Sequence, residues 1–98
     1  MSFDAAYLRE RYGARLISRI ESLSDGLQAG MDADTAMRAF HSIAGIAGTV
    51  GYAAATTIAR DGENACRVSF DRVNLAHLLV QLRTAVSSLY VPDEVESR

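Results

Sequence analysis

Residues 40–51 read FHSIAGIAGTVG, and their apolar residues have the spacing of a helix followed by a break. Counted from Ala36, the apolar positions recur every three or four residues, which places them on one face of an α-helix. This stripe consists of Ala36, Phe40, Ile43, Ala47 and Val50. Gly51 comes next, and glycine commonly stands just past the last residue of a helix. The stretch therefore predicts an amphipathic helix that ends near Gly51.

Three other segments predict helices by the same spacing. Ahead of the stretch, the apolar stripe consists of Leu8, Tyr12, Leu16, Ile20, Leu23 and Leu27. After it, a segment from about residue 53 to residue 68 is rich in small residues and has an expected inner face of Ala55, Ile58, Ala59, Ala65 and Cys66. The last stripe consists of Leu75, Leu78, Leu79, Leu82, Val86 and Leu89.

Capping residues separate these segments. Asp32 or Asp34 can cap the second helix, and Ser69 or Asp71 can cap the fourth. Because short connections make neighbouring helices antiparallel, the sequence predicts an all-α fold, an up-and-down antiparallel four-helix bundle. We expect the bundle to span residues 1–91, followed by a short acidic tail at residues 92–98.

Composition and charge exclude several classes of function. With 98 residues, 49% of them hydrophobic, the chain is the size of one small domain. The net charge of −2 favours neither nucleic acid nor an anionic membrane as a partner. All ten basic residues are arginine, which excludes a Schiff-base or phosphate-loop lysine. One cysteine and no apolar run of about 20 residues predict a reduced, cytoplasmic protein without a membrane span.

His41 is the candidate functional residue. Helical spacing places it at the edge of the apolar stripe or outside it. Its neighbours along the helix are Met37, Arg38, Ala44, Gly45 and Gly48. The small residues among them predict a bare helix surface on the C-terminal side of the ring. The two glycines have two explanations: close packing of another helix, or room for a partner protein to reach the imidazole.

The predicted hairpin adds two carboxylates to this picture. Folding the chain back near Gly51 places residue 41 level with about residue 62, so that Glu63 becomes a neighbour of His41. The same construction about the preceding loop places Glu21 at a similar height. Either glutamate can orient the imidazole or be a solvated surface charge, and the surface interpretation is favoured for Glu21. The two histidines and the cysteine match no metal-ligand spacing, and we expect no metal and no other cofactor.

FHSIAGIAGTVG and its continuation YAAATTIARDGENACR resemble the histidine-containing phosphotransfer (HPt) domain. That family's pattern is a histidine, an aliphatic residue two positions on, lysine three on, glycine four on, a second glycine ten on, and glutamate about twenty-two on. The residues at these positions are His41, Ile43, Ala44, Gly45, Gly51 and Glu63. All match except the lysine.

The resemblance implies a stoichiometric phosphocarrier that binds no nucleotide. His41 would accept a phosphoryl group from the aspartyl phosphate of a response-regulator receiver domain and pass it to another receiver. A hybrid histidine kinase is a further candidate partner, and Mg²⁺ is expected in the partner receiver rather than in this chain. We expect a monomer. The site would combine His41 with Met37, Arg38, Ala44, Gly45, Gly48 and Glu63.

Ala44 is the departure from the family pattern, because an alanine cannot neutralise a phosphoryl group. Arg38, one turn before His41, can neutralise the phosphoryl group instead of the lysine, or it can be a solvated surface charge. The alternative function is therefore a non-phosphorylated interaction module that binds or sequesters a receiver or a histidine kinase. A third hypothesis, the dimerisation helix of a histidine kinase, is disfavoured because Ser42 stands where such kinases usually carry an acidic residue.

Overall fold

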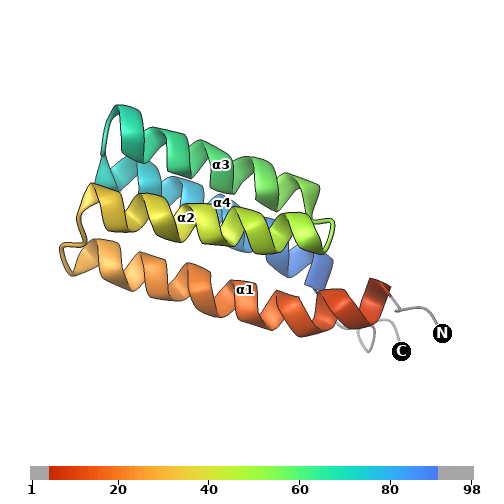
Figure 1. The fold of residues 1–98 in the computed structure, drawn as a ribbon. Helices are drawn as coiled ribbons and strands as arrows, with labels where there is room; N and C mark the ends of the chain where they lie inside the picture. Colours follow the sequence, from red (N-terminus) through yellow and green to blue (C-terminus); the bar gives the residue numbers. More distant parts are fainter. Residues whose placement is uncertain (1–4, 91–98) are drawn as a thin grey trace.

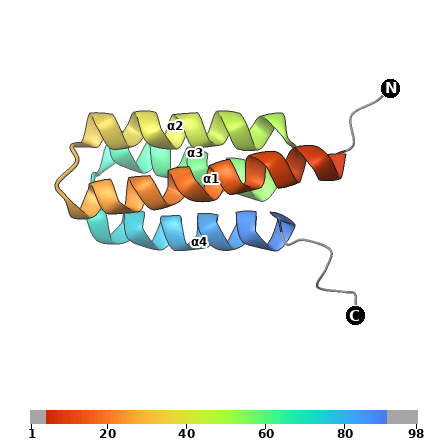
Figure 2. The ribbon, with the colours of Figure 1, turned by 90° about the horizontal axis from the view of Figure 1, so that it is seen from below.

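The computed structural model describes residues 5–90, which form four helices with short connections (Figure 1). The helices are α1 (Ala5–Gln28), α2 (Ala33–Thr49), α3 (Ala53–Val68) and α4 (Arg72–Tyr90). Successive helices run antiparallel, and α1 contacts α2 and α4, as α3 does (Figures 1 and 2). This arrangement confirms the predicted all-α, up-and-down four-helix bundle. The expected acidic tail at residues 92–98 lies outside the described residues.

Helix ends form where glycine and aspartate stand in the sequence. Gly51 has φ +80°, and the next backbone N–H, that of Tyr52, donates to the carbonyl oxygen of Ala47 at 2.9 Å, which closes the last turn of α2. At the other end of α2, Asp32 accepts a hydrogen bond from the Thr35 backbone N–H at 2.8 Å. Hydrogen bonds to Thr35 lower the pKa of the Asp32 carboxyl. Of the two candidate caps, Asp32 rather than Asp34 starts α2.

The start of α4 is capped in the same way. Asp71 Oδ1 accepts hydrogen bonds from the backbone N–H groups of Val73 and Asn74, at 3.0 and 3.4 Å. Ser69 instead occupies the C-terminal end of α3, where its backbone N–H donates to Ala65. The connection between the two helices therefore uses both candidate residues, one at each end. No described helix is long and apolar enough to cross a membrane.

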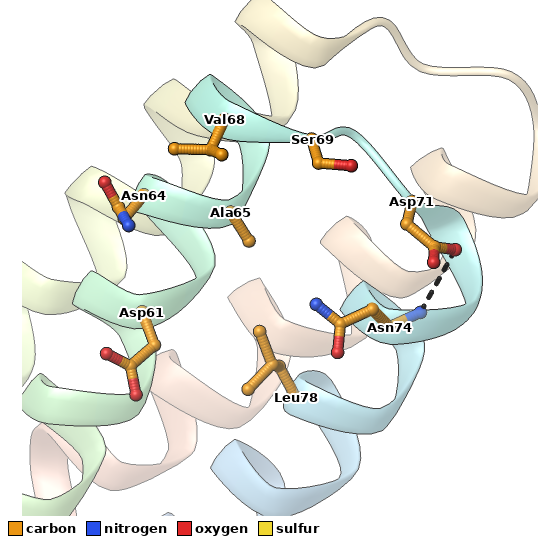
Figure 3. A pocket seen from close by; sticks show the side chains of 8 residues that line it. All are labelled: Asp61, Asn64, Ala65, Val68, Ser69, Asp71, Asn74 and Leu78. Carbon is orange, nitrogen blue, oxygen red and sulfur yellow. Dashed lines mark hydrogen bonds between the residues drawn. The ribbon is translucent and has the colours of Figure 1, made fainter.

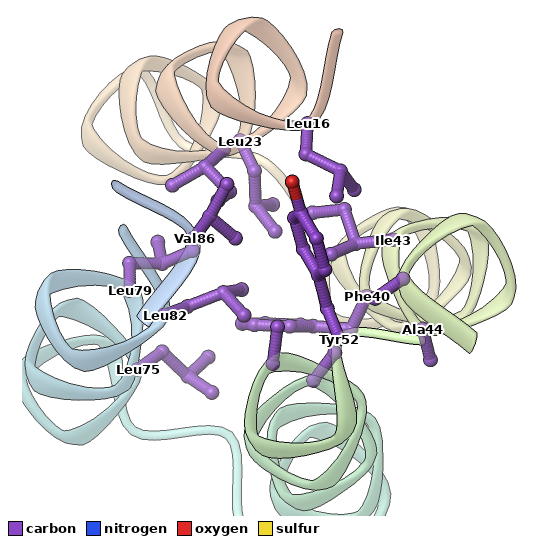
Figure 4. Packing of buried hydrophobic residues seen from close by; sticks show 14 of the residues in the cluster. Leu16, Leu23, Phe40, Ile43, Ala44, Tyr52, Leu75, Leu79, Leu82 and Val86 are labelled. Atoms are coloured by element: carbon purple, nitrogen blue, oxygen red, sulfur yellow. The ribbon is translucent and has the colours of Figure 1, made fainter. Parts of the chain in front are cut away.

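The predicted apolar stripes meet inside the bundle (Figure 4). The four helices contribute the buried residues Leu16, Ile20, Leu23, Leu27, Ala36, Phe40, Ile43, Ala44, Ala47, Ala55, Ala59, Cys66, Leu75, Leu79, Leu82 and Val86. Tyr12, Ile58, Ala65 and Leu78 are half-buried at the margin of this core. Tyr52, which belongs to none of the predicted stripes, is fully buried at the α2–α3 connection. The side chains of Leu8 and Leu89 lie outside the described part of the chain.

Close packing between α2 and α3 is visible at Gly62. Gly62 is buried, and a Cβ atom added there would overlap the ring of Phe40, which is fully buried on α2. A Cβ atom added at Gly45 would meet nothing within 4 Å, although Gly45 lies on the same pair of helices. Close packing therefore depends on Gly62, whereas Gly45 faces open space.

These two glycines are expected to respond oppositely to substitution by alanine. Gly62→Ala should lower the free energy of unfolding by about 1–3 kcal/mol, because the added methyl group overpacks the core against Phe40. Gly45→Ala should raise it by about 0.5–1 kcal/mol, because alanine favours a helix interior more than glycine does. Denaturant-induced unfolding measures both values. A Gly62→Ala variant as stable as the wild-type chain would contradict this account of the α2–α3 contact.

Candidate functional site

His41 lies on α2 beside Glu63 of α3. The Nδ1 atom of His41 is 3.0 Å from Oε2 of Glu63, so the expected proximity of these residues across the hairpin is observed. The two side chains differ in exposure, at 76% for His41 and 20% for Glu63. The imidazole therefore projects from the surface, while the carboxylate that contacts it is largely covered.

The contact with Glu63 decides which nitrogen of the ring is free. An ionised carboxylate offers only acceptors, so the hydrogen bond requires a hydrogen atom on His41 Nδ1. In the neutral ring, Nε2 then carries the lone pair. Because the side chain is largely exposed, this nitrogen is available to a reacting group from outside the protein. The arrangement suits a nucleophile presented to a partner.

The surface on the C-terminal side of His41 is bare. Gly45 and Gly48 are both exposed. A Cβ atom at Gly48 would meet only Thr56 Oγ1, at an ordinary contact distance of 3.9 Å, and one at Gly45 would meet nothing. Neither glycine is needed for helix packing, so the first of the two explanations for them does not apply. What they provide is open space next to the imidazole.

Ala44 does not lie on this bare surface, contrary to the expectation from its spacing. Its exposure is 3%, and it belongs to the core cluster with Ile43 and Ala47. The reason is that position 44 lies on the edge of α2 that packs against its neighbour, where a short side chain is covered. A lysine at such a position can extend its head group to the surface, whereas a methyl group stays inside.

The other predicted residues occupy different places around His41. Arg38 is exposed and forms an ion pair with Asp34 on its own helix. Met37 lies on the side of α2 that faces α3, and its Sδ atom is 3.8 Å from Nη2 of Arg67. Glu21, the second candidate for orienting the imidazole, instead forms an ion pair with Arg83 of α4, with 3.0 Å between Oε2 and Nη2. Glu63 is thus the carboxylate beside the ring.

Arg67 is a residue of the site that sequence reasoning missed. Its Nη2 atom is 3.8 Å from Glu63 Oε2, the same oxygen atom that contacts His41. Glu63 and Arg67 are four residues apart on a helix, in the order that favours an ion pair. The spacing alone could therefore have predicted the ion pair between Glu63 and Arg67. It could not predict the contact with Met37 on α2, because that contact depends on how the two helices pack.

A hollow on the surface lies away from this site, at the α3–α4 connection (Figure 3). It is lined by Asp61, Asn64, Ala65, Val68, Ser69, Asp71, Asn74 and Leu78. The hollow contains no residue of the predicted site. Among the described residues, no group of three or more His, Cys, Asp or Glu side chains is placed to hold a metal ion.

Comparison with known protein families gives a match over most of the bundle. A family model for the Hpt domain matches residues 8–90, which include His41, Glu63, Gly45 and Gly48. The search of curated proteins and the search of solved structures returned no match. Hpt domains are helical phosphocarriers of two-component signalling systems, and they interact with receiver domains and histidine kinases. Because the match to the Hpt family model covers most of the length of this chain, the chain belongs to the Hpt domain family.

Proposed function

We propose that this chain is a histidine phosphotransfer protein, which accepts a phosphoryl group on His41 from a receiver-domain aspartate and passes it to another receiver. The observation that carries the proposal is the exposed imidazole of His41, with Nδ1 bound to Glu63 and Nε2 free. In this function the chain is a stoichiometric carrier that binds no nucleotide and acts as a monomer.

In the proposed step, the lone pair of His41 Nε2 attacks the phosphorus atom of the aspartyl phosphate. The N–P bond forms while the bond from phosphorus to the carboxylate oxygen breaks, and the electron pair of that bond leaves with the carboxylate. The ring keeps the hydrogen on Nδ1 and gains a positive charge, which Glu63 at 3.0 Å balances. Transfer to the next receiver is the reverse step, with the electron pair returning to Nε2.

The partner receiver would supply the charge neutralisation that phosphoryl transfer requires. Phosphoryl transfer requires in-line alignment and neutralisation of the phosphoryl oxygens, and Mg²⁺ in the acidic site of the receiver would supply that neutralisation. The requirement on this chain is to let the receiver come close to Nε2. The exposed surface at Gly45 and Gly48, free of side chains, supports such an approach.

A non-phosphorylated interaction module is the second candidate function. The buried Ala44 favours it, because the family's lysine is absent and the methyl group in its place cannot contact a phosphoryl group. Such a module would bind or sequester a receiver or a histidine kinase through the same surface of α2 and α3. The two functions differ in whether His41 becomes phosphorylated.

Phosphorylation of His41 is tested by incubating the chain with Mg²⁺ and receiver domains that carry a radiolabelled aspartyl phosphate. Wild-type protein is expected to acquire label that is labile in acid and stable in alkali, as a phosphoramidate bond is. His41→Gln should acquire none. His77→Gln is the matched control, because His77 is exposed on α4, and it should label like the wild type. Binding without labelling, across a broad panel of receivers, would contradict the carrier function and support the interaction module.

The bare surface is tested by adding side chains to it. Gly45→Gln and Gly48→Gln should each slow transfer from a phospho-receiver by about tenfold or more, because the added amide occupies space that the receiver needs. Helix content measured by circular dichroism should not change. Ala76→Gln serves as the control, because Ala76 is exposed on α4. Equal transfer rates in all three variants would show that the receiver does not dock over the glycines.

A further inference from the structure

Arg67 is an arginine of α3 whose ion pair adjoins the contact between His41 and Glu63. A single atom connects the three residues, since Glu63 Oε2 is 3.0 Å from His41 Nδ1 and 3.8 Å from Arg67 Nη2. The guanidinium group also lies 3.8 Å from the sulfur atom of Met37, one turn before His41 on α2. It therefore spans from α3 to α2 on the N-terminal side of the imidazole, opposite the bare surface.

The direction of the helices favours Arg67 over Arg38 as a neighbour of the phosphorylated ring. Side chains on a helix tilt toward its N-terminus. On α3 that direction leads from Arg67 toward Glu63 and the level of His41, whereas on the antiparallel α2 it leads from Arg38 away from His41. The ion pairs agree, since Arg67 contacts Glu63 and Arg38 contacts Asp34, each four residues nearer the N-terminus.

The two arginines also lie on different sides of the ring. With 3.6 residues per turn, position 37 lies on one side of His41 on the surface of α2, and position 38 lies on the other. Met37 contacts Arg67 of α3, so its side is the one that faces α3. Ala44 shares that side of α2 but lies three residues beyond His41, so Arg67 and the lysine of the family pattern would approach the ring on the same side and from opposite directions along the helix.

Little holds Arg67 in its present contacts. Its side chain is 60% exposed, and an ion pair at 3.8 Å on a protein surface contributes little to stability. A phosphoryl group bears more negative charge than a carboxylate and accepts paired hydrogen bonds from a guanidinium group. Moving the guanidinium group from Glu63 to a phosphoryl group on His41 therefore exchanges a weak interaction for a stronger one.

We propose that Arg67 binds the phosphoryl group on His41, in place of the lysine that the family pattern has at position 44. The inference rests on the proposed function, because it concerns the phosphorylated form of His41. The phosphoryl group on Nε2 and the Glu63 carboxylate at Nδ1 would lie on different sides of the positively charged ring. Arg67 neutralises the phosphoryl oxygens, and so it preserves phosphohistidine against hydrolysis until a receiver arrives.

The test phosphorylates the chain with phosphoramidate, a small donor that needs no receiver, and follows hydrolysis of the phosphohistidine by ³¹P NMR. Arg67→Ala should shorten the half-life roughly threefold to fivefold, the effect of losing one charge-assisted contact at an exposed site. Arg67→Lys should restore most of it. Arg83→Ala removes one exposed arginine elsewhere and should behave like the wild type, and Arg38→Ala, which removes the other arginine considered for this part, should shorten the half-life less than Arg67→Ala does.

A second measurement distinguishes a contact with phosphate from a structural role. In ¹H–¹⁵N spectra, the side-chain Nε–H resonance of Arg67 should shift when His41 is phosphorylated, and that of Arg83 should not. The inference is wrong if Arg67→Ala keeps the wild-type half-life, if Arg38→Ala shortens it as much, or if the Arg67 resonance does not move.

The outcomes also separate this inference from the proposed function. An effect of Arg67 on phosphohistidine formed by phosphoramidate, together with no transfer from any phospho-receiver, would contradict only the carrier function. Transfer from receivers without an effect of Arg67 would contradict only the role of Arg67. If neither phosphoramidate nor any phospho-receiver labels the wild-type protein at His41, both are contradicted.

Discussion

The contact between the Phe40 ring and the backbone of Gly62 sets how closely α2 and α3 approach each other. The residues that follow these two in the chain are His41 and Glu63, and they meet at the surface directly outside that contact. Phe40 and Gly62 therefore pack the two helices together, and the residues that follow them, His41 and Glu63, form the site. Because a side chain at Gly62 would overlap Phe40, the distance from the imidazole to its carboxylate depends on the absence of a single methyl group.

Glycines have three separate uses in this hairpin. Gly51 adopts a positive φ and closes the end of α2, so that α3 can return alongside it. Gly62 permits close helix packing, while Gly45 and Gly48 leave one surface of α2 without side chains. The last two weaken the helix by up to about 1 kcal/mol each relative to alanine and contribute no packing in return. Such a loss of stability is understandable where a partner has to approach the backbone.

Most of the bundle follows from the spacing of apolar residues. The four stripes predicted the four helices, and counting along the hairpin placed Glu63 beside His41. The choice of Asp32 over Asp34 as cap depends on local backbone geometry, which composition does not specify. Tyr52 was missed as a core residue because it stands alone in a connection, where no periodic pattern can identify it.

The errors at the site have a common cause. Spacing along α2 gives the neighbours of His41 on its own helix, but the face that a neighbouring helix covers depends on packing. Spacing therefore predicts an exposed Ala44 although α2 buries it, and spacing does not identify Arg67, because its approach to Met37 requires two helices in register. Glu21 is no such error, because the surface interpretation favoured for it agrees with its exposed ion pair with Arg83.

The central claim is that Glu63 fixes the hydrogen of His41 on Nδ1 and leaves Nε2 as the nucleophile. The ¹⁵N chemical shifts of the two ring nitrogens test it most directly, measured in the unphosphorylated protein at a pH where the ring is neutral. The account predicts a protonated Nδ1 and an unprotonated Nε2 in the wild type, and loss of that preference in Glu63→Ala. A hydrogen on Nε2 in the wild-type protein would contradict it.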